Sequence, residues 1–115
     1  MTRERPWVGR KIHFIGIGGA GMSGWARVAM QLGADVSGSD QSASPALEGL
    51  RHLGAVITVG HAAENVPAGA DVFHSTAIPE DNPERAAVAL SRPRADLLRE
   101  LTSMAKVIAV AGAHG

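Results

Sequence analysis

With 115 residues, the chain has the usual length of one domain, and it is long enough to bury a core without disulfides or metals. Its 11 basic and 11 acidic residues cancel at pH 7, which excludes the strongly basic surface typical of nucleic-acid-binding proteins. The absence of cysteine excludes a disulfide scaffold, a cysteine nucleophile and a thiolate metal site. No signal peptide is visible, and no apolar run approaches the ~18 residues of a membrane span, so we expect a soluble cytoplasmic protein.

The first expected elements are a buried strand and an amphipathic helix, joined by glycines. Residues 1–10 carry several basic side chains and are expected to form a flexible, solvated leader. Lys11–Ile17 is short and apolar, which predicts a buried strand. From Gly19 to Leu32 apolar residues recur at helical spacing, and Gly33 follows where a helix C-cap is expected.

The middle of the chain repeats this alternation. We expect strands at Asp35–Ser39, Val56–Val59 and Asp71–Ser75. Ser44 followed by proline predicts the start of a helix that ends at Gly54.

The last third is expected to hold two helices and a final strand. One helix starts at Asn82-Pro83, with Ala86, Ala87 and Leu90 toward the sheet, and another covers Asp96–Met104. Lys106–Ala111 is apolar and is expected to be a last buried strand. Between these helices Pro93 argues against a regular strand, so a strand there is expected to be very short or absent.

Strands that alternate with helices predict a single α/β domain over residues 11–111, with a Rossmann-like, doubly wound parallel sheet. In such sheets ligands bind at the carboxyl ends of the strands, near the point where the strand order reverses. The polar clusters of this sequence follow the predicted strands, which favours a binding role for that edge.

The glycine-rich segment Gly16–Gly21 satisfies G-x-G-x-x-G between a predicted strand and a predicted helix. The glycines permit a tight turn and a close approach of backbone to phosphate, and the helix end offers free N–H groups to an anion. We therefore expect this loop to bind a phosphate group, although the pattern does not identify the compound that carries it.

Asp40 is a candidate for the rest of that ligand, because it lies 19 residues after Gly21 at the end of the second predicted strand. An acid at this place accepts hydrogen bonds from ribose hydroxyls in dinucleotide enzymes, and a carboxylate can equally accept from the N–H of uracil. It could also cap the turn Ser39–Ser42. NAD and a uridine nucleotide stay open at this point.

The segments HFIGIGGAGMSG, VSGSD, HSTAIPEDNPE and VAGAHG together resemble the ATP-dependent Mur ligases of peptidoglycan synthesis, in particular the branch that adds L-alanine to UDP-N-acetylmuramate. The resemblance runs from about Lys11 to Gly115, and STAIPEDNPE is its most specific part. It implies three domains in the whole enzyme, of which the first binds the UDP-sugar rather than NAD.

The resemblance also implies roles for individual residues. Gly18 to Ser23 would hold the diphosphate, Asp40 and His61 would face the nucleotide, and the turn at Ser75 would line the sugar or phosphate side. The UDP-sugar site expected in this way comprises Gly18, Gly19, Ala20, Gly21, Met22, Ser23, Asp40, His61, Ser75, Thr76 and Ala77. His13, His52 and His74 are interpreted as structural, and no set of residues has metal-ligand spacing.

The last four residues, Gly112, Ala113, His114 and Gly115, resemble the start of the family's ATP loop, with Ala113 in place of threonine. The loop's lysine and the hydroxyl residue that ligates magnesium are not in the sequence. The resemblance therefore implies a first domain that binds UDP-N-acetylmuramate and is inactive as a ligase by itself. ATP, Mg²⁺ and L-alanine would be bound by other domains.

The alternative interpretation is an NAD-binding domain of a dehydrogenase or of a ligand-sensing regulator. The glycine loop and Asp40 fit it equally well. The segment after the fourth predicted strand does not, because no NAD fingerprint requires it.

Overall fold

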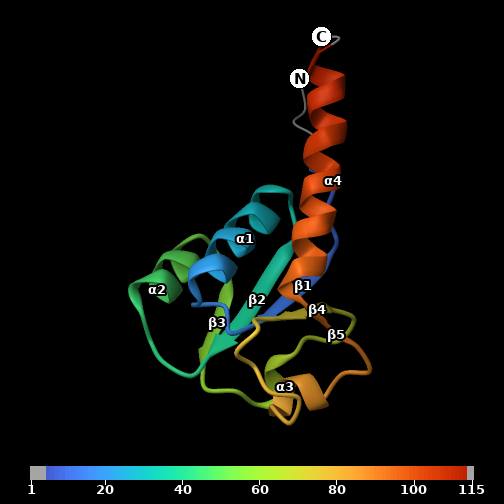
Figure 1. The fold of residues 1–115 in the computed structure, drawn as a ribbon. Coiled ribbons are helices and arrows are strands. Elements are labelled where there is room, and N and C mark those ends of the chain that lie inside the picture. The colour runs from blue at the N-terminus through green and yellow to red at the C-terminus, as the bar shows by residue number, and fades with distance from the viewer. Residues whose placement is uncertain (1–4, 114–115) are drawn as a thin grey trace.

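A five-stranded, all-parallel sheet with the order β3-β2-β1-β4-β5 organises the chain (Figure 1). The computed structural model describes residues 5–113. The strands are β1 (Lys11–Ile15), β2 (Asp35–Asp40), β3 (Val56–Val59), β4 (Asp71–His74) and β5 (Ser91–Pro93). The helices are α1 (Ala20–Gln31), α2 (Pro45–His52), α3 (Pro83–Ala86) and α4 (Arg94–Ala113), with a 3-10 turn η1 (Ala63–Asn65). This is the predicted Rossmann-like arrangement.

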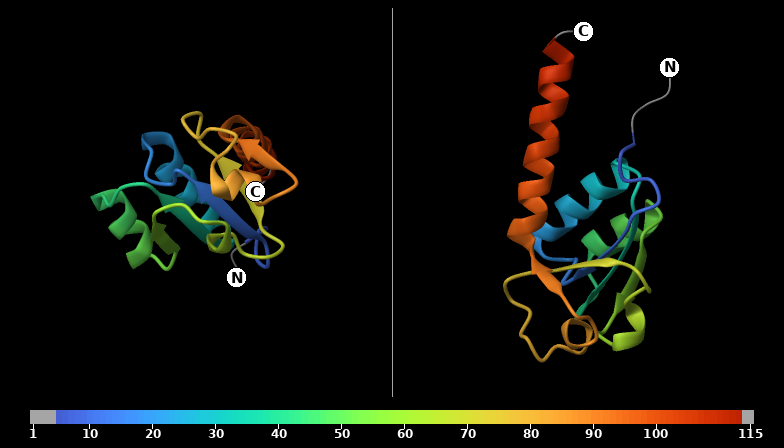
Figure 2. Two further views of the ribbon diagram at one scale, coloured as in Figure 1. Left: turned by 90° about the horizontal axis from the view of Figure 1, so that it is seen from below. Right: turned by 90° about the vertical axis from the view of Figure 1, so that its right-hand side faces the viewer.

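Strand order reverses at β1, because the chain proceeds from β1 to β2 and β3 on one side and returns to β4 and β5 on the other. Helix α1 lies between α2 and α4 and contacts both (Figures 1 and 2). The short elements η1 and α3 contact each other. The carboxyl ends of β1, β2 and β4 therefore meet beside the amino end of α1, which is where doubly wound sheets place their ligands.

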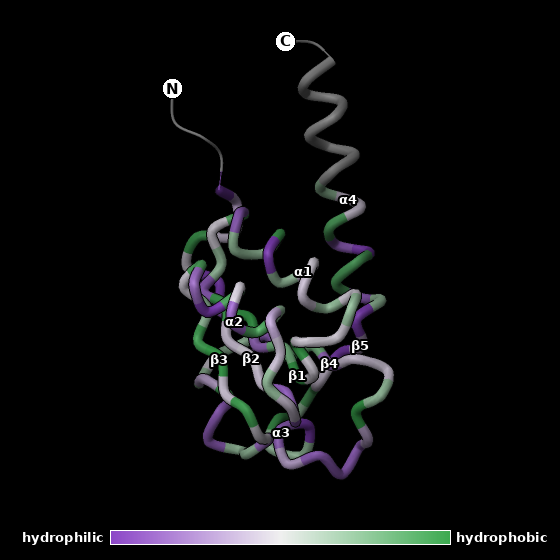
Figure 3. The backbone as a smooth tube through the Cα atoms, turned by 90° about the vertical axis from the view of Figure 1, so that its left-hand side faces the viewer, coloured by the Kyte–Doolittle hydropathy of each residue, from purple (hydrophilic) through white to green (hydrophobic). Residues whose placement is uncertain are grey.

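The core is aliphatic with one aromatic pair at its centre. The rings of Phe14 in β1 and Phe73 in β4 lie 6.3 Å apart and are both fully buried. Met22, Ala26 and Ala29 form the buried stripe of α1, which is the apolar face that the helical periodicity predicts. Hydropathy along the backbone follows this pattern, with hydrophobic segments in the sheet and hydrophilic stretches in the loops near α3 (Figure 3).

Within residues 5–10, which were expected to belong to a flexible, solvated leader, Trp7 and Arg10 contact the rest of the domain, whereas the other four residues are exposed. Trp7 is 7% exposed, and its N–H donates to the Leu32 carbonyl at 2.9 Å. The Arg10 guanidinium lies over the Trp7 ring and pairs with Asp71 and Glu100. An aromatic ring and a paired cation thus hold this segment to the domain, and residues 1–4 lie outside the described part of the chain.

The helix predicted from Asn82 onward is a single turn. The Asn82 side chain caps α3 by accepting from the N–H groups of Glu84 and Arg85, as its sequence position predicts. The inward-facing side chain is Glu84, however, and the prediction that Ala86, Ala87 and Leu90 face the sheet is wrong, because all three are exposed. The chain leaves the helix after one turn in order to reach β5.

The prediction of a last buried strand at Lys106–Ala111 is also wrong, because α4 continues through this segment to Ala113. A short apolar run does not distinguish a strand from a helix, and neither glycine nor proline separates this one from the preceding helical residues. Gly112 and Ala113 belong to α4, and His114 and Gly115 lie outside the described residues.

The doubtful fifth strand exists as the three residues of β5, paired with β4 at the edge of the sheet. Pro93 is the last residue of this edge strand. Its lack of an N–H group therefore removes no hydrogen bond from the middle of the sheet.

Gly38 in β2 has no room for a side chain, because a Cβ there would lie 2.8 Å from Ile17 Cβ and 2.9 Å from the Phe14 carbonyl oxygen. We expect Gly38→Ala to lower the free energy of unfolding by about 1–3 kcal/mol in urea titrations. Gly24→Ala is the matched control, since Gly24 lies on the exposed face of α1 with open space around it. That change should raise stability by about 0.5–1 kcal/mol, and equal effects of the two substitutions would contradict the packing argument.

Candidate functional site

A cleft of about 500 Å³ opens at the carboxyl ends of β1, β2 and β4. Its walls come from the glycine turn after β1, the segment after β2, His61 after β3 and the long loop between β4 and α3. The lining residues are Gly16, Gly19, Asp40, Gln41, His61, Ser75, Ala77, Ile78, Pro79, Asp81, Asn82 and Pro83. The sequence-predicted residues of four separate segments therefore meet in one cleft.

The turn after β1 requires glycine for two reasons. Gly16 has φ +83°, a left-handed conformation, and a Cβ on it would lie 2.9 Å from Ser75 Oγ. The N–H groups of Gly16 and Ile17 donate to the Ser39 carbonyl, which fixes the turn on the end of β2. The Gly19 N–H donates back to the Gly16 carbonyl at 3.1 Å and closes the turn.

The amino end of α1 is open at its first turn. Gly19 is the N-cap, no side chain of the described residues caps this end, and its first turn holds no acidic residue. Backbone N–H groups at a helix start, together with the helix dipole, make an anion-binding position. The Arg94 guanidinium lies directly beside Gly21 and adds a positive charge there, whereas the Met22 side chain is buried in the core.

Asp40 both braces the loop and lines the cleft. Its Oδ2 accepts from the Gly18 N–H at 2.8 Å, and a Cβ on Gly18 would lie 2.9 Å from the same oxygen. Asp40 is partly exposed. One carboxylate oxygen is therefore engaged with the glycine loop, on the wall that a ligand in the cleft would meet.

His61 lines the cleft, and its ring is hydrogen-bonded to a cluster of buried polar groups. Its Nδ1 lies 2.9 Å from Ser39 Oγ, and Ser39 Oγ donates to Glu84 Oε1 at 2.7 Å. Glu84 is fully buried and also accepts from Asn65 Nδ2 and from the Ala62 N–H.

His13 completes this cluster from β1, with Nε2 2.5 Å from Glu84 Oε1 and Nδ1 2.8 Å from Ser37 Oγ. Burial raises the pKa of the Glu84 carboxyl, but the hydrogen bonds from His13, Asn65, Ser39 and the Ala62 N–H together outweigh it and lower the pKa to about 2. Glu84 is therefore ionised at neutral pH.

Only some of the residues that the sequence predicts for the site line the cleft. Of the predicted residues, five line it, namely Gly19, Asp40, His61, Ser75 and Ala77. The other six are not among its lining residues: Gly18, Ala20, Gly21, Met22, Ser23 and Thr76. Sequence reasoning missed the cleft residues Ile78, Pro79 and Asp81, which lie inside the segment STAIPEDNPE. It also missed the supports Ser39, Asn65 and Glu84; the signal for Glu84 was its place two residues after a helix N-cap, on the inward side of a single turn.

His13 and His74 take structural positions, whereas His52 is exposed at the end of α2. His13 is buried against Ser37 and Glu84, and His74 is buried with Nδ1 2.6 Å from Ser91 Oγ. Burial, with the charge of Arg85, lowers the pKa of His74. Within residues 5–113, no three histidine, aspartate or glutamate side chains come together in a way that would hold a metal ion.

No helix of the described residues is long and apolar enough to cross a membrane.

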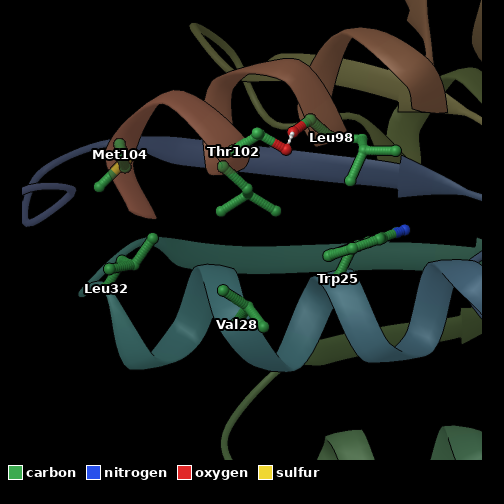
Figure 4. Close-up of a pocket in the computed structure, with 7 residues that line it drawn as sticks. Trp25, Val28, Leu32, Leu98, Thr102 and Met104 are labelled. Carbon is green, nitrogen blue, oxygen red and sulfur yellow. Dashed lines mark hydrogen bonds between the residues drawn. The ribbon is translucent and has the colours of Figure 1, made fainter. Parts of the chain in front are cut away.

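A second concavity lies between α1 and α4, away from the strand ends (Figure 4). Trp25, Val28 and Leu32 of α1 face Leu98, Thr102 and Met104 of α4 across it, and Leu101 completes the lining. The groove measures about 320 Å³ and its walls are apolar. The side chains that the structure describes along it are not titratable.

Comparison with known proteins identifies relatives over nearly the whole chain. A family model described as "Mur ligase family, catalytic domain" matches residues 11–110. The chain is 48% identical over 110 residues to a UDP-N-acetylmuramate–L-alanine ligase of Janthinobacterium, and 51% identical over 111 residues to one of Solidesulfovibrio magneticus. Each match covers 92% of this chain and 24% of the relative.

Among solved structures, UDP-N-acetylmuramate–alanine ligase MurC of Thermotoga maritima superposes with a TM-score of 0.76 at 34% identity, covering 82% of this chain and 23% of that one. A ligase of Neisseria meningitidis that acts on UDP-N-acetylmuramate and an alanyl-glutamyl-diaminopimelate peptide reaches a TM-score of 0.55 at 30% identity, covering 67% and 24% of the two chains. The chain thus spans about a quarter of the length of these relatives.

The lowered pKa of Glu84 makes the free energy of unfolding depend on pH in the acidic range. A carboxyl whose folded pKa of about 2 lies below its ordinary 4.5 stabilises the fold above pH 4.5, and this contribution of roughly 3 kcal/mol is lost as the pH falls toward 2. We expect the free energy of unfolding to fall between about pH 5 and pH 2, and this part of the fall to disappear in Glu84→Gln.

At neutral pH the same variant should be less stable by about 2–4 kcal/mol, because its buried donors lose their charged acceptor. Glu80→Gln, an exposed acid in the same loop, is the control and should follow the unaltered protein at every pH. An identical acid dependence in Glu84→Gln would show that Glu84 is not the group responsible.

Proposed function

Since the chain belongs to the Mur ligase family, we propose that it is the UDP-N-acetylmuramate-binding domain of the ligase that adds L-alanine to this nucleotide sugar in peptidoglycan synthesis. The cleft supports the proposal, because it combines a glycine turn, an open helix end and hydrogen-bonding side chains at the carboxyl edge of the sheet. Identities of 48–51% to such ligases over 92% of the chain support this ligand rather than NAD.

In this proposal each part of the cleft meets one part of the ligand. The diphosphate lies at the amino end of α1, where the backbone of Gly18–Ser23 and the nearby Arg94 guanidinium favour negative charge. Asp40 and His61 face the uridine, whose N–H and O–H groups are donors for a carboxylate oxygen and an imidazole nitrogen. The turn at Ser75–Ala77 lies toward the sugar or its phosphate.

The whole ligase reaction extends beyond these residues. In the proposed reaction ATP and Mg²⁺ supply phosphoryl transfer to the muramyl carboxylate, and the amine of L-alanine then attacks the acyl phosphate. The residues described here fit no metal ion, because they form no cluster of three potential ligands. We propose that the role of this chain is to bind and orient the UDP-sugar, and we expect it to have no ligase activity by itself.

Calorimetry with UDP-N-acetylmuramate, UDP and NAD tests the proposal directly. We expect the first two to bind and NAD not to bind, because the recognised groups are a diphosphate and a uridine. Binding of NAD without UDP would replace the proposal with a dinucleotide-binding function. A phosphate-release assay with UDP-N-acetylmuramate, L-alanine, ATP and Mg²⁺ should show no turnover, and turnover would refute the assignment of catalysis to other domains.

Asp40→Ala should weaken UDP binding by about 1–3 kcal/mol, because it removes both a ligand acceptor and the brace on the Gly18 N–H. Asp35→Ala is the matched control, since Asp35 is exposed at the opposite end of the same strand. Calorimetry should find its UDP affinity unchanged. Equal UDP affinities for Asp40→Ala and the unaltered chain would remove Asp40 from the site.

A further inference from the structure

Three polar side chains form a hydrogen-bonded chain from the core to the cleft. Glu84 is fully buried, Ser39 is fully buried beside it, and His61 lines the cleft. The connecting distances are 2.7 Å from Ser39 Oγ to Glu84 Oε1 and 2.9 Å from Ser39 Oγ to His61 Nδ1. His61 Nδ1 also lies 3.5 Å from Glu84 Oε2.

The number of hydrogens available decides the direction of these bonds. The ionised carboxylate of Glu84 can only accept, and a serine hydroxyl has one hydrogen to donate. Two oxygens at 2.7 Å without a hydrogen between them would repel each other, so the Ser39 hydrogen lies toward Glu84. Ser39 Oγ then has only lone pairs left for His61, and the bond at 2.9 Å requires a hydrogen on His61 Nδ1.

We propose that Glu84 and Ser39 are positioning residues that hold His61 in its Nδ1–H tautomer, so that Nε2 accepts a hydrogen bond from the ligand in the cleft. In a neutral imidazole one ring nitrogen donates and the other accepts. With Nδ1 bonded to Ser39, Nε2 is the nitrogen left for a ligand. The identity of that ligand rests on the proposed function.

The fixed tautomer selects the chemical class of the group that His61 recognises. An acceptor at Nε2 fits an N–H or O–H donor, such as the imide N–H of uracil or a ribose hydroxyl. It does not fit a phosphate oxygen, which is itself an acceptor. His61 therefore belongs with the nucleoside part of the ligand and not with the diphosphate at α1.

Long-range ¹H–¹⁵N spectra of the histidine-labelled chain test the tautomer without any variant. At about pH 8, where free imidazole is neutral, His61 should show a protonated Nδ1 and an unprotonated Nε2. Its resonances are assigned by their loss in His61→Gln. A protonated Nε2 with a bare Nδ1 would overturn the proposal.

Ser39→Ala then tests the positioning role. This variant should give His61 a mixed tautomer pattern and weaken binding of UDP-N-acetylmuramate about three- to tenfold. Ser37→Ala is the matched control, because Ser37 is a buried serine of the same strand that bonds His13 instead. It should leave the His61 pattern and the ligand affinity unchanged.

The two readouts separate the possible failures. Unchanged ligand affinity in a folded Ser39→Ala chain with altered His61 tautomers would overturn the positioning role. An unaltered chain that binds neither UDP nor UDP-N-acetylmuramate would overturn the proposed function and the acceptor role with it. The tautomer measured in the unliganded chain would still stand as a test of the Glu84–Ser39–His61 bonding.

Discussion

The buried carboxylate of Glu84 is the interaction on which the arrangement of the site depends. It accepts hydrogen bonds from β1 through His13, from β2 through Ser39, and from the segment after β3 through the Ala62 N–H and Asn65. A lone charge in this place would be strongly unfavourable, and these donors make it tolerable. Because these donors come from three different segments, satisfying the charge also fixes the segments relative to one another.

This polar cluster lies directly beneath the cleft. Ser39 takes part in both, since its hydroxyl bonds Glu84 while its backbone carbonyl accepts the N–H groups of the glycine turn. The glycine turn and His61 thus both bond to the same residue of β2. A change in the core here would be felt at the site without altering any residue that touches the ligand.

Sequence reasoning predicted the parts of the fold that local periodicity determines. The first four strands, α1 and α2 have clear apolar patterns and cap signals, and the structure places them as expected within a few residues. It failed at Lys106–Ala111, where an apolar run is compatible with either a strand or a helix. It also failed at α3, where the inward position is filled by a charged residue that hydropathy assigns to the surface.

The residues of the candidate site also differed in how far the sequence could predict them. Residues with a motif, such as the glycines and Asp40, could be located from spacing alone. The supports of His61 could not, because Ser39, Asn65 and Glu84 are far apart in sequence and carry no pattern that links them. The sheet register places Ser39 between β1 and β3, and the contact between η1 and α3 brings Asn65 and Glu84 together.

Gly19 at the start of α1 shows how binding and folding are linked in this domain. A serine or aspartate there would stabilise the helix by only about a few tenths of a kcal/mol relative to glycine, by satisfying one of its first N–H groups. Glycine has no side-chain oxygen for those groups, so they stay open for a ligand, and under the proposed function the diphosphate would accept from them. In the proposed complex the substrate would take the place of the missing cap, so that binding it would also stabilise the first turn of α1.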